Sequence, residues 1–123
     1  MTALGTPVPI LRIFDEQKAR EFYRGYLSFT VVFEHSFEPA LPLYLEIRRD
    51  DAVLHLSEHH GDSSPGARIR IAVQDIEEFH RGLAAKDDRH LRPAIIDQPW
   101  GMREMTLTDP FSNRLTFFQS AGG

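Results

Sequence analysis

The sequence contains no cysteine, no long apolar run and no excess of basic residues. Because cysteine is absent from all 123 positions, disulfide frameworks, thiolate zinc sites and cysteine nucleophiles are excluded. No apolar stretch approaches the roughly 18 residues of a membrane span, so we expect no membrane partner. The 14 basic and 18 acidic residues give a formal net charge of −4. This balance argues against a nucleic-acid partner, because duplex binders usually carry a basic surface.

The first residues also lack the basic start and apolar core of a signal peptide, so we expect a cytoplasmic protein. A chain of this length is close to the commonest domain size and predicts a single domain over residues 1–123. What the sequence does have is aromatic residues, 13 in all, nine of them Phe.

Short apolar runs alternate with two amphipathic stretches. Asp15 and Asp75 each follow a predicted strand and stand where a helix N-cap belongs, with apolar residues at helical spacing after them. Strands are predicted at 8–14, 28–34, 43–49, 52–57, 68–73, 94–96, 105–108 and 115–118.

This order predicts an α+β fold of two βαβββ modules, residues 7–58 and 67–119, joined by a polar link at 59–66. A plain α+β sheet without internal symmetry is the alternative.

The hairpin around Asp50-Asp51 yields the sharpest geometric expectation. A symmetric turn there pairs residues whose numbers sum to 101, so Glu46 lies opposite His55 on one face, with their Cβ atoms about 5 Å apart. Tyr44 and Ser57 form the next pair on that face. A carboxylate beside an imidazole is either a metal half-site or an acid–base pair. The alternative is a hydrogen-bonded pair on an ordinary sheet.

Several aromatic residues stand outside the predicted core stripes. Phe33 and Phe37 flank His35 at the end of a strand, and Trp100 lies between Pro99 and Gly101. A lone Trp on such an irregular segment often lines a ligand site or an interface, although it can also cap the edge of a core. Arg103 follows closely and could pair with a ligand or with the neighbouring Glu104.

Two motifs resemble the vicinal oxygen chelate superfamily, which includes glyoxalases, bleomycin resistance proteins and dioxygenases. The opening, Phe14-Asp15 with Ala19, Phe22-Tyr23 and Leu27-Ser28-Phe29, is similar to the family's "D…A…FY…LGF", with Ser28 in place of Gly. The turn from Asp109 to Asn113 resembles its "DP-x-GN", with Ser112 in place of Gly. A further segment, Gln98-Pro99-Trp100-Gly101 followed by Arg103-Glu104, resembles the bleomycin resistance branch more specifically.

This resemblance implies two modules whose curved mixed sheets form a cleft, and a homodimer in which arms exchange between subunits. It also implies metal positions in the family's enzymes, which match Val8, His55, Arg68 and Thr116 here. Only His55 among these would ligate a divalent ion well, so the expectation is no metal and no cofactor, with His55 and Glu46 the sole candidate ligands.

The leading hypothesis is a binding protein without chemistry that sequesters an aromatic or cationic small molecule of the glycopeptide antibiotic class, such as bleomycin. The candidate ligand-binding residues are Phe33, Phe37, Tyr44, Glu46, His55, Trp100 and Arg103. A metal-dependent glyoxalase- or dioxygenase-like enzyme using Glu46 and His55 is the alternative. A third hypothesis is a scaffold whose aromatic residues only form a dimer interface.

Overall fold

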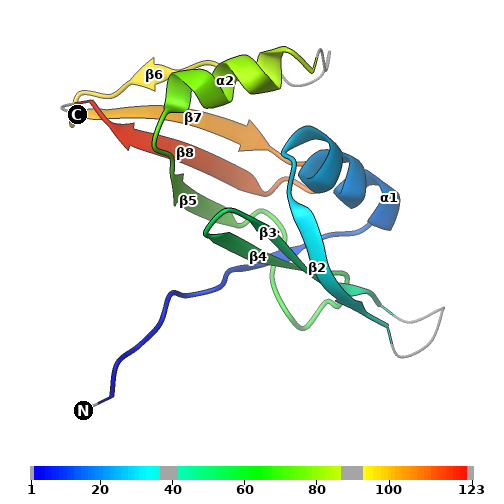
Figure 1. Ribbon diagram of the computed structural model, residues 1–123. Coiled ribbons are helices and arrows are strands. Elements are labelled where there is room, and N and C mark those ends of the chain that lie inside the picture. Colours follow the sequence, from blue (N-terminus) through cyan, green and yellow to red (C-terminus); the bar gives the residue numbers. More distant parts are fainter. Residues whose placement is uncertain (1, 37–41, 87–92, 122–123) are drawn as a thin grey trace.

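Two four-stranded mixed sheets form the framework of the protein (Figure 1). The structure is a computed structural model and describes residues 2–36, 42–86 and 93–121. Sheet A has the order β1-β4-β3-β2 and sheet B the order β5-β8-β7-β6. In each, the first strand of the module runs parallel to the last and the remaining pairs are antiparallel. The predicted pair of βαβββ modules is therefore confirmed.

The elements follow the predicted order, and most boundaries shift by one to three residues. They are β1 (Ile10–Arg12), α1 (Glu16–Ala19), the π-helical η1 (Arg20–Tyr26), β2 (Thr30–His35), β3 (Tyr44–Arg49), β4 (Ala52–Ser57), β5 (Arg68–Ala72), α2 (Ile76–Ala84), β6 (Ile96–Asp97), β7 (Met102–Thr108) and β8 (Arg114–Ser120).

Both helices begin at the predicted aspartates. The Asp15 carboxylate accepts a hydrogen bond from the Lys18 backbone N–H at 2.9 Å, and Asp75 accepts one from Glu78 at 3.1 Å. Each bond satisfies a backbone donor that the first turn of a helix leaves free. The first helix then widens into η1, which the sequence pattern did not predict and which places Phe22, Tyr23 and Tyr26 in the core.

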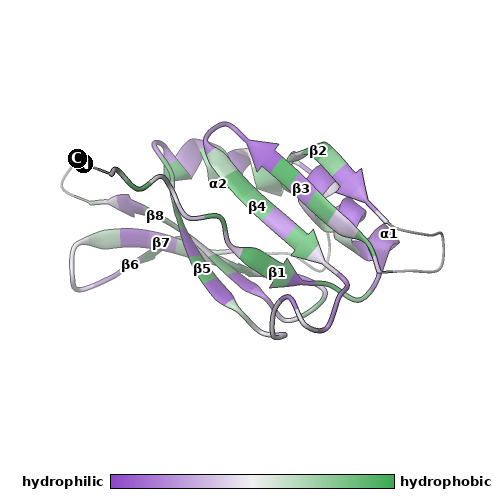
Figure 2. Cartoon of the chain, turned by 90° about the horizontal axis from the view of Figure 1, so that it is seen from below, coloured by the Kyte–Doolittle hydropathy of each residue, from purple (hydrophilic) through white to green (hydrophobic). Residues whose placement is uncertain are grey.

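One core connects the two sheets. Leu11, Leu45 and Leu56 of sheet A belong to the same buried cluster as Met105 and Leu115 of sheet B. Alternate residues along the strands of sheet A are apolar and polar, as Figure 2 shows. Each sheet consequently has an inner face toward this core and an outer face that carries the polar and exposed aromatic side chains.

The turn between β7 and β8 joins the modules through a buried polar network. The Asp109 carboxylate accepts hydrogen bonds from the Tyr23 hydroxyl at 2.6 Å and from the backbone N–H groups of Phe111 and Asn113 at 2.8 Å each. The Asn113 side chain donates to the Arg12 carbonyl at 2.8 Å. Burial, with the adjacent Asp109 charge, raises the pKa of Tyr23, which therefore remains a neutral donor.

The two serines that replace glycine in the resembled motifs both occupy the left-handed region. Ser28 has φ 60° and Ser112 has φ 72°. Glycine adopts such angles without steric cost, whereas a Cβ atom clashes with the backbone. The structure thus explains why glycine suits these two positions.

Candidate functional site

Four side chains gather on the outer face of sheet A, and we call them the aromatic cluster: Phe33, Tyr44, Glu46 and His55. The hairpin register pairs Glu46 with His55 and Tyr44 with Ser57, which confirms the geometry predicted from the turn. Phe33 of β2 pairs with Glu46 on the other side, after a bulge. Three strands therefore contribute to one surface.

The rings of the aromatic cluster contact one another. The Phe33 and Tyr44 rings stack with their centroids 6.5 Å apart. His55 meets both edge-on, at 5.2 Å from Tyr44 and 6.4 Å from Phe33. Phe33 is 45% exposed, a large apolar area for a side chain on the face that points away from the core. An exposed surface of aromatic rings such as this one can bind a ligand or another protein surface.

Two hydrogen bonds determine which nitrogen of the neutral His55 imidazole carries the proton. His55 Nε2 lies 3.0 Å from Glu46 Oε1, and Nδ1 lies 2.6 Å from the Tyr44 hydroxyl. A carboxylate can only accept, so Nε2 carries a proton, and in the neutral ring Nδ1 accepts from Tyr44. Burial, followed by the charges of Asp62 and Glu46, raises the pKa of Tyr44. The hydroxyl therefore stays protonated and acts as a donor.

Arg103 lies in β7 of the other sheet, and Trp100 lies in the turn that precedes this strand. Trp100 is 63% exposed in the turn between β6 and β7, where Gly101 has φ 85°. Arg103 Nη1 binds Glu77 at 2.8 Å and Nε binds Asp97 at 2.9 Å. These two bonds raise the pKa of Arg103. Glu104, one of the two partners considered for Arg103, does not pair with it, because consecutive residues of a strand point to opposite faces.

Four of the seven predicted site residues therefore come together, and Trp100 and Arg103 lie apart from them, in the β6–β7 turn and in β7 of sheet B. Phe37 falls outside the described residues.

The sequence did not predict a second polar arrangement, on the outer face of sheet B. Arg70 Nη2 donates to Glu104 at 2.7 Å, and its guanidinium lies over the Phe118 ring at 4.6 Å. The bond from Arg70 is the main cause of the lowered pKa of Glu104, which is only 5% exposed. Beside this pair, the Thr106 and Thr116 hydroxyls lie 2.9 Å apart. These residues meet only through the pairing of β5, β7 and β8.

The positions matched to the family's metal ligands shift when the strands are paired. Ile10, rather than Val8, lies beside His55 in β1, and Arg70, rather than Arg68, lies beside Thr116 in β5. An aliphatic chain offers no donor, and a guanidinium repels a cation. In the described part of the chain, no three His, Asp or Glu side chains group in a way that could hold a metal ion.

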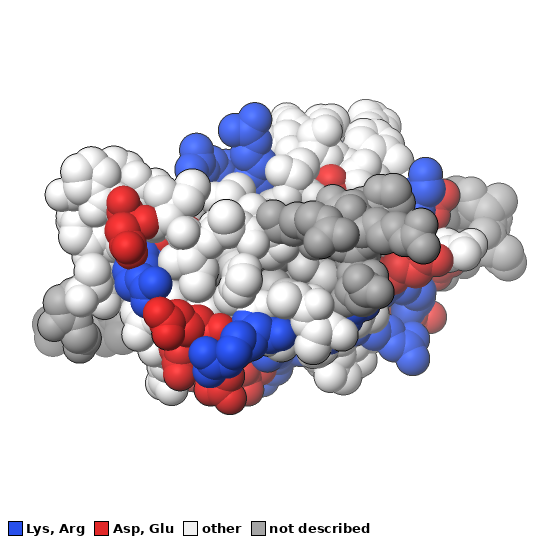
Figure 3. All heavy atoms as spheres, turned by 90° about the horizontal axis from the view of Figure 1, so that it is seen from above, with Lys and Arg blue, Asp and Glu red and all other residues white. Residues whose placement is uncertain are grey.

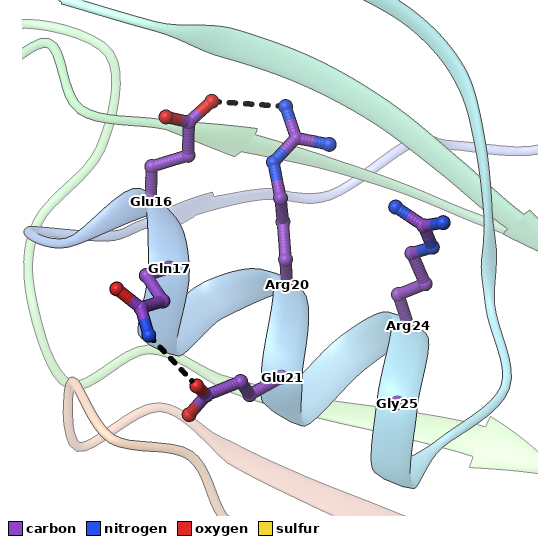
Figure 4. Close-up of a pocket in the computed structure, with 6 residues that line it drawn as sticks. All are labelled: Glu16, Gln17, Arg20, Glu21, Arg24 and Gly25. Atoms are coloured by element: carbon purple, nitrogen blue, oxygen red, sulfur yellow. Dashed lines mark hydrogen bonds and ion pairs between the residues drawn. The ribbon is translucent and has the colours of Figure 1, made fainter.

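Two hollows lie away from the aromatic cluster. One, of about 440 Å³, runs over α1 and η1, where Arg20 binds Glu16 at 2.9 Å and Gln17 binds Glu21 at 3.2 Å (Figure 4). A larger groove of about 900 Å³ lies between the β3–β4 turn and α2. Acidic and basic side chains interleave on the face that includes α2 (Figure 3). Neither hollow collects charge of one sign.

Comparisons with known proteins agree on one superfamily. Residues 3–123 match the family described as "Glyoxalase superfamily protein". The chain is 28% identical over 130 aligned residues to a bleomycin resistance protein of Geobacillus stearothermophilus, covering 91% of this chain and 94% of the relative.

Among solved structures, a bleomycin-binding protein complexed with bleomycin superposes with a TM-score of 0.74 at 22% identity, covering 95% and 99% of the two chains. The bleomycin-binding protein of Streptomyces verticillus, complexed with copper(II)-bleomycin, gives a TM-score of 0.71 at 25% identity, with 95% of this chain and 97% of that chain covered.

Within the described residues, no helix is long and apolar enough to cross a membrane.

Proposed function

The chain belongs to the glyoxalase/bleomycin resistance superfamily, and we propose that within it this protein binds a small aromatic molecule without transforming it. The observation that carries the proposal is the aromatic cluster, in which exposed Phe33 stacks on Tyr44 beside an oriented His55. Flat rings fit against such a surface by stacking and edge contacts. Glu46, beside them, would accept a hydrogen bond from a polar or cationic group of the ligand.

The similarity to bleomycin resistance and bleomycin-binding proteins supports a glycopeptide antibiotic as the first ligand to test. We therefore take bleomycin as the probe.

We further propose that the binding unit is a homodimer with exchanged arms. Residues 2–8 are exposed and extend away from the body (Figure 1). Leu4 is 94% exposed and Val8 43%, although both are apolar. A second copy that covered the arm and an outer sheet face would bury this surface. Such an arrangement would bring Trp100 of one subunit toward the aromatic cluster of the other.

The arrangement of Glu46, His55 and Tyr44 also favours a second candidate, a metal-dependent enzyme that uses the first two as ligands. This function needs at least one more ligand. Ile10 and Arg70, at the register positions of the family's ligands, are unable to supply it. Metal analysis of the purified protein decides between the two. Stoichiometric Mn, Fe, Ni or Zn that is lost in His55→Ala would favour the enzyme and contradict the binding protein.

Fluorescence of the single tryptophan tests binding itself. We expect saturable quenching of Trp100 when metal-free bleomycin is added, because Trp100 lines the same groove in the proposed dimer. No change up to millimolar ligand would remove bleomycin as the ligand. If Trp100→Ala bound bleomycin as tightly as the parent, measured by calorimetry, the stacking role of Trp100 would be wrong.

A further inference from the structure

The outer face of sheet B carries an excess of arginine that the proposed function does not use. In the parallel pairing of β5 with β8, Arg68 lies beside Arg114 and Arg70 lies beside Thr116. Neighbouring strands are about 5 Å apart and alternate residues of a strand about 7 Å, so three arginine side chains start from one small area of this face. All three arginines are exposed.

Only one carboxylate faces these three cations on the strands of this sheet. Glu104, paired with Phe118 in the β7–β8 register, is on the same face and binds Arg70. Neither Arg68 nor Arg114 forms an ion pair with any described residue. Like charges placed side by side on adjacent strands destabilise a sheet unless something compensates them. The face therefore carries a local charge of about +2 in a protein whose formal net charge is −4.

Arg70 is held in place rather than free to move. Buried Glu104 binds its Nη2 and the Phe118 ring lies beneath the guanidinium. Arginine has five N–H donors in a planar fork, and the side chain of Arg70 remains 44% exposed. Exposed Thr106, whose hydroxyl is hydrogen-bonded to Thr116, adds a neutral polar group to the same patch.

We propose that this arginine face, defined by Arg68, Arg70, Arg114 and Thr106, binds the oxyanion of a small molecule, such as a carboxylate or a phosphate. Guanidinium groups bind both anions through paired, charge-assisted hydrogen bonds. The overall negative charge of the protein argues against a polyanion such as nucleic acid. The oxyanion would bind the arginine face, and the rings of the same ligand would cover the aromatic cluster. Only this second part rests on the proposed function.

Chemical-shift titration of the ¹⁵N-labelled full chain tests the proposal. Sodium phosphate is added in one arm and sodium benzoate in the other, with ionic strength held constant by sodium chloride. We expect saturable shifts that are largest in β5 and β8 and weaker binding in Arg114→Gln and Arg68→Gln, by about tenfold for each lost charged donor. Tighter binding of benzoate would identify an aromatic acid, and tighter binding of phosphate a phosphorylated ligand.

Arg81→Gln is the matched control, because Arg81 is an exposed arginine of α2, which does not contribute to the arginine face. It should bind both anions as the parent does. Shifts that do not saturate, or an equal loss in Arg81→Gln and Arg114→Gln, would overturn the arginine face. Inorganic phosphate has no ring to cover the aromatic cluster, so the result of the phosphate arm is separate from the outcome of the bleomycin titration.

Discussion

The Tyr44 hydroxyl lies 2.6 Å from His55 Nδ1, although the two residues are not paired in the hairpin register. The register places Tyr44 opposite Ser57, two positions from the Glu46–His55 pair, so this bond crosses the ladder diagonally. Because Glu46 accepts from Nε2, the neutral ring must have its proton on Nε2. Nitrogen chemical shifts of His55 should therefore report the Nε2–H tautomer. In Tyr44→Phe, Glu46 still accepts from Nε2, so we expect the Nε2–H form to persist. The double variant Tyr44→Phe with Glu46→Gln weakens both constraints on the ring, so it should show the largest population of the Nδ1–H form.

Truncating Asp109 should cost more stability than any single surface change. Its carboxylate accepts from Tyr23, Phe111 and Asn113, and Asp109 is 4% exposed. Removing a buried acceptor leaves its donors unpaired, so Asp109→Ala should lower the free energy of unfolding by about 3–5 kcal/mol. Urea denaturation measures this loss. In a double-mutant cycle with Tyr23→Phe, purely additive losses would contradict direct coupling of the two side chains.

Ser112→Gly should stabilise the protein. Ser112 has φ 72°, where a Cβ atom is strained and glycine is not. The gain should be about 1 kcal/mol in the free energy of unfolding, measured by denaturant titration. Ser112→Ala is the control, because it removes the hydroxyl and keeps the Cβ atom. If alanine stabilised the protein as much as glycine, relief of backbone strain would not be the cause.

Arg70 should make the thermal stability depend on pH on the acid side. Its bond lowers the pKa of Glu104 below the ordinary 4.5. A carboxyl whose pKa is lowered on folding stabilises the protein fully above its unfolded pKa, and this stabilisation is lost as the pH falls through the folded pKa. Arg70→Gln should thus lower the melting temperature clearly at pH 7 and less at pH 3. A difference that stayed constant between pH 7 and pH 3 would mean that the ion pair does not stabilise the fold.

Local patterns were enough to predict much of this molecule. Alternation and two aspartate caps predicted the paired modules, and the centre of one short turn predicted that Glu46 faces His55. Both features depend on residues close in sequence. The motif at Asp109–Asn113 pointed to the family, and its role as a junction with Tyr23 emerged only in three dimensions.

What the sequence could not predict depends on the pairing of distant strands. Arg70 and Glu104 are 34 residues apart and meet only because β8 lies between β5 and β7. The same pairing moved the matched metal positions to Ile10 and Arg70. The sequence also grouped Phe33 with Trp100 as exposed aromatic residues, but the structure places Phe33 in β2 of sheet A and Trp100 in the turn between β6 and β7 of sheet B. A groove that contains both needs a second subunit, which remains a prediction.

Calorimetric titration of metal-free bleomycin into the EDTA-treated protein, its Phe33→Ala variant and the matched Phe14→Ala variant tests the central proposal most directly. Phe14 is also an exposed phenylalanine, 54% against 45%, but packs against Phe111 outside the aromatic cluster. We predict saturable binding without metal, weakened about tenfold by Phe33→Ala through the lost stacking, and unchanged in Phe14→Ala. Binding that appeared only after a divalent metal was restored, or that Phe33→Ala left unchanged, would contradict a metal-free site on the aromatic cluster.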